Sequence, residues 1–334
     1  MLNQRILFAR KPSGLPVAED FASDTVPVAR PGDGQFLSRT IYLSLDPYYR
    51  NVMKGHPMYT ERLVPGSVMT GETVAQVLES RHPEFAAGDY VLVRNGWQQY
   101  ALSSGQGVRK LDPQQAPVST ALGVLGMPGL TGYAGTVFLG KPRPGQTVVV
   151  SAATGPVGST AGQVARHMGA RIVGIAGLDV KCRYAVEELG FAACVNYKDG
   201  ELQHSLKAAC PEGIDLYFDN VGGDTLVAVL ANLAMHARVV LCGIIAAYSA
   251  EVPPPGPFLG PIVGARATME GLVVFDHLQR LPELLRVVGG WIREGSFRYR
   301  EDLSDGLASA PEAFCKLMRG ENFGKALVRI GADS

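Results

Sequence analysis

Hydrophobic and polar positions change their spacing once along this chain of 334 residues, near residue 126. Before that point, short β-branched and aromatic runs such as residues 35–43, 71–78 and 90–93 are separated by Pro and Gly. This punctuation predicts a β-rich domain shaped as a small barrel or partly open sheet. After it, apolar runs alternate with amphipathic segments, an order that predicts a doubly wound α/β fold with a parallel sheet.

The second region predicts strands and helices in turn. The strands are expected at residues 147–150, 172–175, 194–195, 214–219, 238–242 and 271–275. The helices are expected after the first strand and at residues 180–189, 202–209, 225–233 and 277–291. Residues 246–264 are so rich in proline that we expect a long functional loop there.

The end of the chain predicts a return to the first domain. Residues 297–302, 308–318 and 326–330 have the pattern strand, helix, strand. We therefore expect three segments, with boundaries at residues 1–125, 126–296 and 297–334. The length fits two domains on the usual size of about 100–200 residues each.

A glycine turn between the first two strands of the second region is the most informative motif. It reads Ala153-x-Gly155-x-x-Gly158, preceded by a run of valines and followed by an amphipathic segment. Gly155 allows backbone N–H groups to approach a pyrophosphate, and Gly158 allows the helix to pack close to the strand. The helix N-terminus adds unpaired N–H donors. The motif predicts a dinucleotide site, although such a turn also occurs as a purely structural one.

The end of the second strand indicates which dinucleotide is bound. An NAD site usually has a carboxylate there for the ribose hydroxyls, but this strand ends in Gly177, and Asp179 comes late enough to cap the next helix instead. Lys181 and Arg183 follow, and cations suit the 2′-phosphate of NADP. We expect NADP(H), the alternative being that both cations are solvated helix residues.

Composition and charge exclude several classes of protein. Lys plus Arg and Asp plus Glu balance at 31 each, so no electrostatic footprint for nucleic acid or a membrane surface is present. No apolar run reaches the roughly 20 residues that span a bilayer, and the first residues do not read as a secretory signal. A cytoplasmic location is expected.

Cysteines and histidines do not form a metal-binding pattern. The five cysteines are odd in number and widely spaced, and the six histidines are equally scattered. We expect most of the cysteines to be small buried hydrophobes, with no disulfide framework and no structural or catalytic metal. The cysteines are Cys182, Cys194, Cys210, Cys242 and Cys315.

Several short motifs along the chain point to one family. They are AATGPVGS at residues 152–159, FDNVGG at 218–223, MEG at 269–271, LSLDPYYR at 43–50, GMPGLT at 126–131 and ENFGK at 321–325. With these motifs the chain resembles the medium-chain dehydrogenase/reductases and, within them, the zinc-free alkenal/one oxidoreductases, which include prostaglandin reductases, plant double-bond reductases and bacterial NADPH-dependent curcumin reductases. The resemblance implies a GroES-like catalytic domain built from both chain ends and a Rossmann domain between them.

The resemblance also implies which residues contact the cofactor. Lys181 and Tyr197 would contact the adenosine 2′-phosphate, and Asn220 would meet the ribose. The pyrophosphate turn comprises Thr154, Gly155, Pro156, Val157 and Gly158. The nicotinamide side comprises Cys242, Gly243, Ile244, Ile245 and Tyr248, together with Leu272, Val273, Val274 and Asn322.

Two positions depart from the family pattern, and one region differs from the zinc enzymes of the superfamily. Gly132 stands where the family often has Ala, and Leu178 stands where it often has a small polar residue. Zinc alcohol dehydrogenases carry Gly-His-Glu in the catalytic domain, whereas this chain has Gly71-Glu72 in that neighbourhood. Without a Lewis acid, oxidation of a simple alcohol loses the group that stabilises an alkoxide, whereas an electron-poor C=C needs less help.

These features predict reduction of the C=C bond of an α,β-unsaturated ketone or aldehyde, by hydride transfer from NADPH to the β-carbon. Tyr248 and Tyr48 are the candidate donors to the enolate oxygen, because a phenol stays protonated at neutral pH. The alternative is that both hydroxyls are simply satisfied in the core. Asp46 and Asp219 are assigned to turn geometry, and Tyr59 and Trp97 are further candidates for lining the pocket.

Two other classes of function stay open at this stage. The chain could be a quinone reductase or an allylic-alcohol dehydrogenase, or a non-catalytic NADPH-binding protein kept for structure or regulation. The family leads us to expect a homodimer, for which the apolar segment 271–275 could supply a pairing strand.

Overall fold

The computed structural model describes residues 1–55, 62–252 and 254–332. The chain divides into two compact units, the first made of residues 1–122 and 301–334 and the second of residues 123–300. The sequence led us to expect the boundaries at 125/126 and 296/297. Within the described residues, no helix is long and apolar enough to cross a membrane.

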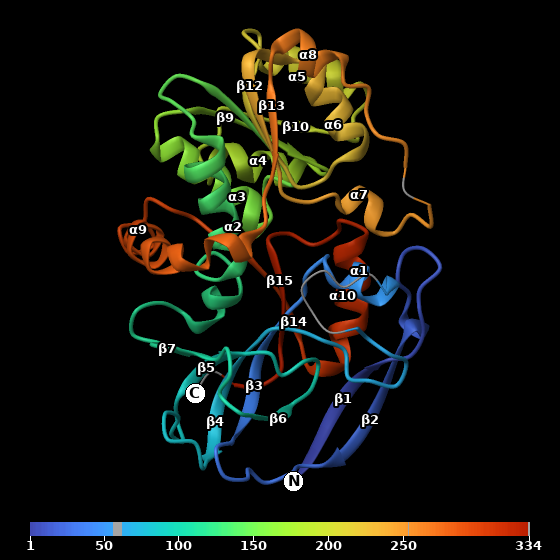
Figure 1. Ribbon diagram of the computed structural model, residues 1–334, viewed down its shortest axis with the longest axis vertical. Coiled ribbons are helices and arrows are strands. Elements are labelled where there is room, and N and C mark those ends of the chain that lie inside the picture. Colours follow the sequence, from blue (N-terminus) through green and yellow to red (C-terminus); the bar gives the residue numbers. More distant parts are fainter. Residues whose placement is uncertain (56–61, 253, 333–334) are drawn as a thin grey trace. The chain divides into compact units, whose positions relative to one another are not determined.

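The second unit is built on a parallel sheet. Its strands, within the described residues, lie in the order β10-β9-β8-β11-β12-β13 (Figure 1). They are β8 Thr147–Ser151, β9 Arg171–Ala176, β10 Ala193–Asn196, β11 Ile214–Asp219, β12 Leu233–Leu241 and β13 Thr268–Gly271. The predicted doubly wound parallel sheet is confirmed, and its order is that of a dinucleotide-binding fold.

Both faces of this sheet are buried, which explains the continuous valine run of β8. Val148 and Val150 pack with Phe218 in one core cluster, whereas Val149 packs with Tyr217 in another. Successive side chains of a strand point to opposite faces, so a strand covered on both sides must be apolar throughout.

Five helices described in this unit, which begin at residues 156, 179, 202, 223 and 281, lie near their predicted starts, whereas those that begin at residues 127, 245 and 260 were not predicted. The helices are α2 Met127–Ala134, α3 Pro156–His167, α4 Asp179–Glu187, α5 Leu202–Ala209, α6 Gly223–Leu230, α7 Ile245–Tyr248, α8 Gly260–Ala265 and α9 Leu281–Arg293. A π-helix, Gly135–Gly140, extends α2, and a 3-10 helix, Val274–Arg280, precedes α9.

The structure corrects two predictions in this unit. Residues 246–264 are not one loop, because α7 continues to Tyr248 and α8 begins at Gly260. Proline at the first turn of α8 is compatible with a helix start. The last strand is Thr268–Gly271 rather than 271–275. It pairs with β12 only as far as Leu241 opposite Gly271, and the following apolar residues enter the 3-10 helix.

The first unit is β-rich, as predicted. Its main sheet, in the described part of the chain, has the order β14-β15-β3-β4-β5-β7, with β6 also paired to β3. The strands are β3 Phe36–Ser44, β4 Thr73–Ser80, β5 Tyr90–Val93, β6 Tyr100–Ser103, β7 Arg109–Leu111, β14 Glu301–Asp305 and β15 Lys325–Arg329. β1 Leu2–Phe8 and β2 Phe21–Pro27 form a separate antiparallel pair.

Both chain ends contribute to this first unit. β15 lies between β14 and β3, so the C-terminal segment completes the sheet that the N-terminal segment begins (Figure 1). Its helices are α1 Tyr49–Lys54 and α10 Ala310–Met318, with 3-10 turns at Ala18–Asp20, Val118–Leu122 and Leu307–Ser309.

Trp97 belongs to the core of the first unit. Its ring stacks on Phe21 with centroids 5.5 Å apart and meets Phe314 edge-on at 5.8 Å, and the residue is 0% exposed. The expectation that Trp97 lines a pocket is therefore wrong, because a large apolar ring gains more from burial between two aromatic neighbours.

Candidate active site

The strand order of the second unit indicates where a ligand is expected to bind. The chain leaves β8 toward β9 on one side and returns to β11 on the other, so the order reverses between these two strands. Ligands of open α/β sheets bind outside the carboxyl ends of the strands at such a switch point. Here those ends are Ser151 and Asp219.

The predicted pyrophosphate turn lies directly after β8. Ala152 has a left-handed backbone conformation (φ 49°), which is unusual for a residue with a Cβ, and Gly155 is the N-cap of α3. A Cβ on Gly158 would lie 2.4 Å from the Ala152 carbonyl oxygen, so only glycine permits this approach. Helix geometry leaves the N–H groups of Val157 and Gly158 without intrahelical partners, which fits a phosphate group.

Gly132 supports the same turn from α2. A Cβ on this residue would lie 2.5 Å from the Val157 carbonyl oxygen and 2.9 Å from the Ala161 amide nitrogen. Alanine at this position would therefore require α2 and α3 to move apart. The glycine at this position is matched to the close packing of the two helices.

The end of β9 forms the predicted adenosine side. A Cβ on Gly177 would lie 2.7 Å from the ring of Tyr197, so the tyrosine ring occupies the space beside the glycine. Lys181 lies in the first turn of α4 and is 7% exposed. Asp179 does not cap α4; instead its carboxylate accepts a hydrogen bond from Asn196 Nδ2 at 2.8 Å.

The turn after β11 is held by buried hydrogen bonds. Asp219 Oδ1 accepts from the Tyr217 hydroxyl at 2.7 Å and from the backbone N–H groups of Val221 and Gly222 at 2.9 Å. Burial raises the pKa of Asp219 above its ordinary value, although these bonds act in the opposite direction. The assignment of Asp219 to turn geometry is confirmed.

Asn220 is anchored to the end of β8. Its backbone N–H donates to Ser151 Oγ at 2.9 Å and its Nδ2 donates to the Ser151 carbonyl oxygen at 2.7 Å. The two strand ends that flank the switch point are thereby joined. Ser151 has this role without any motif that marks it in the sequence.

The segment after β12 lies against the carboxyl end of β11. The amides of Cys242 and Gly243 donate to the Asp219 carbonyl oxygen at 2.8 and 3.1 Å. A Cβ on Gly243 would lie 3.2 Å from the Asn220 carbonyl oxygen and 3.7 Å from the Tyr248 hydroxyl oxygen. The structure therefore brings Tyr248, Gly243 and Asn220 together.

The other residues predicted for the nicotinamide side differ in their exposure. Ile244 is 52% exposed and precedes α7, which Ile245 begins. Burial raises the pKa of the Cys242 thiol to about 12, with the Asp219 carboxylate adding to the effect, so this thiol is neutral at neutral pH. Leu272 packs in the core cluster of Phe218, whereas Val273 is half-buried. Val274 is buried at the start of the 3-10 helix.

The predicted residues of the first unit lie on two segments. Tyr48 is the N-cap of α1, and Asn322 precedes β15, where its Nδ2 donates to the Gly324 carbonyl oxygen at 2.9 Å. Tyr59 lies outside the described residues.

A buried ion pair lies beside Tyr48 in the sequence. Lys325 Nζ contacts Asp46 Oδ1 at 2.6 Å and donates to the Leu45 carbonyl oxygen at 2.9 Å. Ser44 Oγ donates to the other oxygen of Asp46 at 2.5 Å. The aspartate is therefore more than a turn residue: its negative charge is balanced by an amine 279 positions away. Within the described residues, no cluster of three His, Cys, Asp or Glu side chains suited to a metal ion is present.

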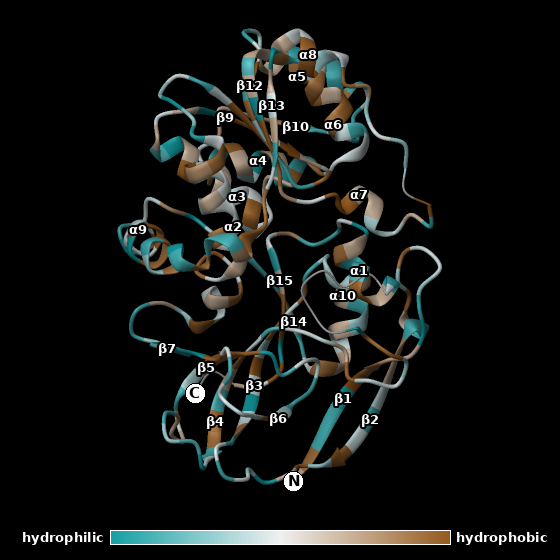
Figure 2. Cartoon of the chain, in the orientation of Figure 1, coloured by the Kyte–Doolittle hydropathy of each residue, from teal (hydrophilic) through white to brown (hydrophobic). Residues whose placement is uncertain are grey.

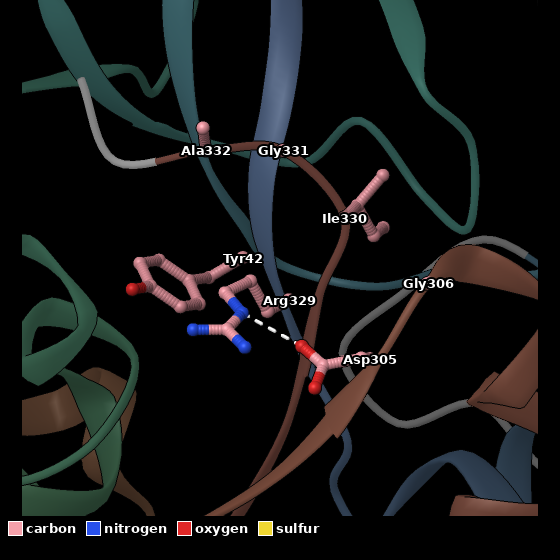
Figure 3. A pocket seen from close by; sticks show the side chains of 7 residues that line it. All are labelled: Tyr42, Asp305, Gly306, Arg329, Ile330, Gly331 and Ala332. Atoms are coloured by element: carbon pink, nitrogen blue, oxygen red, sulfur yellow. Dashed lines mark hydrogen bonds and ion pairs between the residues drawn. The ribbon is translucent and has the colours of Figure 1, made fainter.

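Two cavities lie elsewhere. One, of about 520 Å³, is in the first unit beside the ion pair of Arg329 and Asp305 (2.7 Å), with Tyr42 on its wall (Figure 3). The other, of about 360 Å³, is in the second unit and includes Lys141 and Arg238. None of the predicted site residues lines either cavity.

Models of two protein families match the two parts of the chain. The "N-terminal domain of oxidoreductase" matches residues 4–111, and "Zinc-binding dehydrogenase" matches residues 156–289. The fold is that of a medium-chain dehydrogenase/reductase.

Similar proteins show to which branch of this family the chain belongs. The chain is 44% identical to the NADPH-dependent curcumin reductase of Escherichia coli (99% of this chain, 98% of that protein) and 38% identical to the NADP(+)-dependent 2-alkenal reductase of Nicotiana tabacum (99% and 98%). The crystal structure of CurA from Vibrio vulnificus in complex with NADPH matches with a TM-score of 0.94 at 41% identity (98% and 99%). The chain belongs to the zinc-free branch of the medium-chain dehydrogenase/reductases that contains these reductases.

Proposed function

We propose that this protein reduces the C=C bond of α,β-unsaturated ketones or aldehydes with NADPH. The observation that carries the proposal is the full-length similarity to two reductases whose named substrates, curcumin and 2-alkenals, both contain a C=C bond conjugated to a carbonyl group. The residues at the switch point fit the same chemistry.

The chain's own residues fit a dinucleotide with a 2′-phosphate. The turn after β8 offers N–H groups at the start of α3. Lys181 supplies a cation in the first turn of α4, the ring of Tyr197 lies against Gly177, and the carboxylate of Asp179 accepts a hydrogen bond from Asn196. The residue directly after β9 is a glycine and a cation follows it, which favours the 2′-phosphate of NADPH over the ribose diol of NADH.

Bound NADPH supplies a hydride to the β-carbon of the conjugated system. Negative charge then develops on the carbonyl oxygen of the substrate, and a neutral phenol stabilises it by donating a hydrogen bond. We assign this role to Tyr248, whose hydroxyl lies at the strand end beside Gly243, with Tyr48 of the first unit as the second candidate. A proton that reaches the α-carbon completes the reduction.

The direct test measures NADPH oxidation with 2-alkenals, enones and quinones, and identifies the products. Allylic alcohols are tested in the opposite direction, with NADP⁺. We expect saturated ketones and aldehydes, with the C=O group intact. Faster turnover of quinones would replace the proposal with a quinone reductase. Tight NADPH binding with no turnover of any member would show that the protein has a non-catalytic role.

We also propose that the protein forms a homodimer. β13 lies at one edge of the parallel sheet in the described part of the chain, and it mixes polar and apolar residues (Figure 2). An edge strand offers unpaired backbone groups to a second copy. Sedimentation equilibrium would test this, and a monomer at micromolar concentration would contradict it.

A further inference from the structure

Two cysteine thiols meet beside the predicted 2′-phosphate site. Cys194 on β10 donates a hydrogen bond to Cys182 on α4, with 3.0 Å between the two sulfur atoms. Both residues are partly exposed, in contrast to the buried Cys210 and Cys315. The expectation that the cysteines are mostly inert buried hydrophobes does not hold for this pair.

The surroundings favour reaction at Cys182. The hydrogen bond from Cys194 lowers the pKa of the Cys182 thiol, and one from the Ala176 backbone acts in the same direction. Burial and the Asp179 carboxylate oppose this. The donated bond and burial raise the pKa of Cys194 above its ordinary value. The thiol of Cys182 is thus the more acidic of the two and supplies the attacking sulfur, and the Cys194 thiol reacts with it in the second step.

We propose that Cys182 and Cys194 form a reversible disulfide in the presence of a hydroperoxide, and that this disulfide weakens NADPH binding. The two sulfur atoms have to approach by about 1 Å to reach bonding distance. The consequence for NADPH rests on the proposed site, whereas formation of the disulfide does not.

Disulfide formation needs only the two cysteines and the hydroperoxide, which is the oxidant, and does not involve NADPH. The Cys182 thiolate attacks the outer oxygen of the hydroperoxide, the O–O bond breaks, and an alcohol or water leaves with a proton from solvent, which produces a sulfenic acid. The Cys194 sulfur then attacks the Cys182 sulfur, the S–O bond breaks, and water leaves with the Cys194 proton. Two thiols lose two electrons, and the hydroperoxide gains them.

The disulfide is expected to affect NADPH binding because both cysteines are close in the sequence to residues of the predicted 2′-phosphate site. Cys182 is the residue after Lys181 in the first turn of α4, and Cys194 lies three residues before Tyr197. Helix α4 packs on β9 and β10, and the Tyr197 amide donates to the Ala176 carbonyl oxygen at 3.0 Å. Movement of either sulfur is therefore transmitted to the side chains proposed to hold the phosphate.

In the test, the full-length protein is first reduced and then treated with hydrogen peroxide. The remaining free thiols are blocked, and the protein is digested for peptide analysis. We expect a peptide pair linked through Cys182 and Cys194, and dithiothreitol should reverse the link. In the same samples, NADPH affinity measured by fluorescence should fall at least about threefold on oxidation and recover on reduction. The affinity for NADH should change less, since NADH has no 2′-phosphate.

Linkage provides a second measurement. If the disulfide weakens NADPH binding by some factor, saturating NADPH must lower the equilibrium constant for disulfide formation by the same factor. This constant is measured in a thiol redox buffer. The matched variants are Cys182→Ser and Cys194→Ser, which should lose the response, and Cys315→Ser in the other unit, which should keep it.

Several outcomes would overturn the proposal. One is a folded protein in which peroxide produces no linked peptide, and another is a linked protein with unchanged NADPH affinity. Loss of affinity in Cys194→Ser as large as in the wild type would also overturn it. Failure of the phosphate-site assignment is distinguished separately, because Lys181→Ala in the reduced protein would then leave NADPH affinity unchanged.

Discussion

Asn220 is bound to Ser151 twice, through its backbone N–H to Oγ at 2.9 Å and through its side-chain Nδ2 to the carbonyl oxygen at 2.7 Å. These bonds join the carboxyl ends of β11 and β8, the two strands between which the sheet order reverses. The turn that is expected to meet the ribose is thereby fixed to the turn that is expected to hold the pyrophosphate.

Replacement of Ser151 by Ala tests this connection. The hydroxyl is fully buried, so its loss leaves the Asn220 N–H without its acceptor and should cost about 1–3 kcal/mol of unfolding free energy. We expect a raised KM for NADPH as well, because the ribose side loses its anchor. Urea unfolding and steady-state kinetics measure the two effects. Ser205→Ala, on the exposed face of α5, is the control, and equal behaviour of both variants would contradict the role of Ser151.

Replacement of Lys181 by Ala tests the proposed contact with the 2′-phosphate. Loss of a charge-assisted hydrogen bond should weaken NADPH binding by roughly 10-fold or more. NADH binding should be unchanged, since the group it contacts is absent from NADH. Titration with both nucleotides measures this selectivity. Lys207→Ala removes an exposed cation from α5 and should alter neither affinity; an equal loss for NADPH and NADH in Lys181→Ala would indicate a structural role instead.

Replacement of Tyr248 by Phe tests the proposed donor. If the hydroxyl stabilises the enolate oxygen, kcat should fall at least about 10-fold while NADPH affinity changes little. Tyr48→Phe, measured in parallel, determines which of the two tyrosines has the larger effect. Tyr100→Phe on β6 is a control distant in the sequence from both. An unchanged kcat in Tyr248→Phe would remove this residue from the mechanism.

Replacement of Asp219 by Asn tests the effect of a buried carboxylate on stability. Burial raises the pKa of Asp219, so the folded protein holds this proton to higher pH than the unfolded chain does. Between the two pKa values the folded state binds more protons, and stability therefore falls as pH rises through that interval. Asparagine keeps an oxygen for the donors to Oδ1 and removes the charge.

The stability of Asp219→Asn relative to the wild type should therefore increase as pH rises from the acid range to neutrality. Urea unfolding at several pH values measures this difference. Asp224→Asn at the exposed start of α6 is the control. A relative stability of Asp219→Asn that is constant or falls with pH would show that the carboxylate is not destabilised by burial.

The sequence predicted those elements whose pattern is local. β11 and α5 begin and end at the expected residues, since an apolar run between turn signals or an amphipathic helix of two turns is specified by neighbours in the chain. The strand expected at residues 271–275 was misplaced. Those residues are as apolar as a strand, but Leu272 packs on Phe218, and strand pairing stops with the end of β12.

The candidate site divides in the same way. The glycine turn of α3 and the lysine of α4 were found from the sequence, because steric room at Gly158 and a cation after a strand end are properties of short segments. Ser151 and the ion pair of Asp46 with Lys325 were not found. Their roles depend on partners that no local pattern indicates, in the second case 279 positions away.

The sequence by itself thus determined the parallel sheet, the dinucleotide turn and the family to which the chain belongs, since these depend on residue spacing. Only the tertiary structure placed the thiol of Cys194 3.0 Å from that of Cys182. The reason is that the chain turns back after α4, so that β10 packs against the same helix. Reactivity of such a pair depends on a contact between side chains, and that contact exists only once the helix is packed on the sheet.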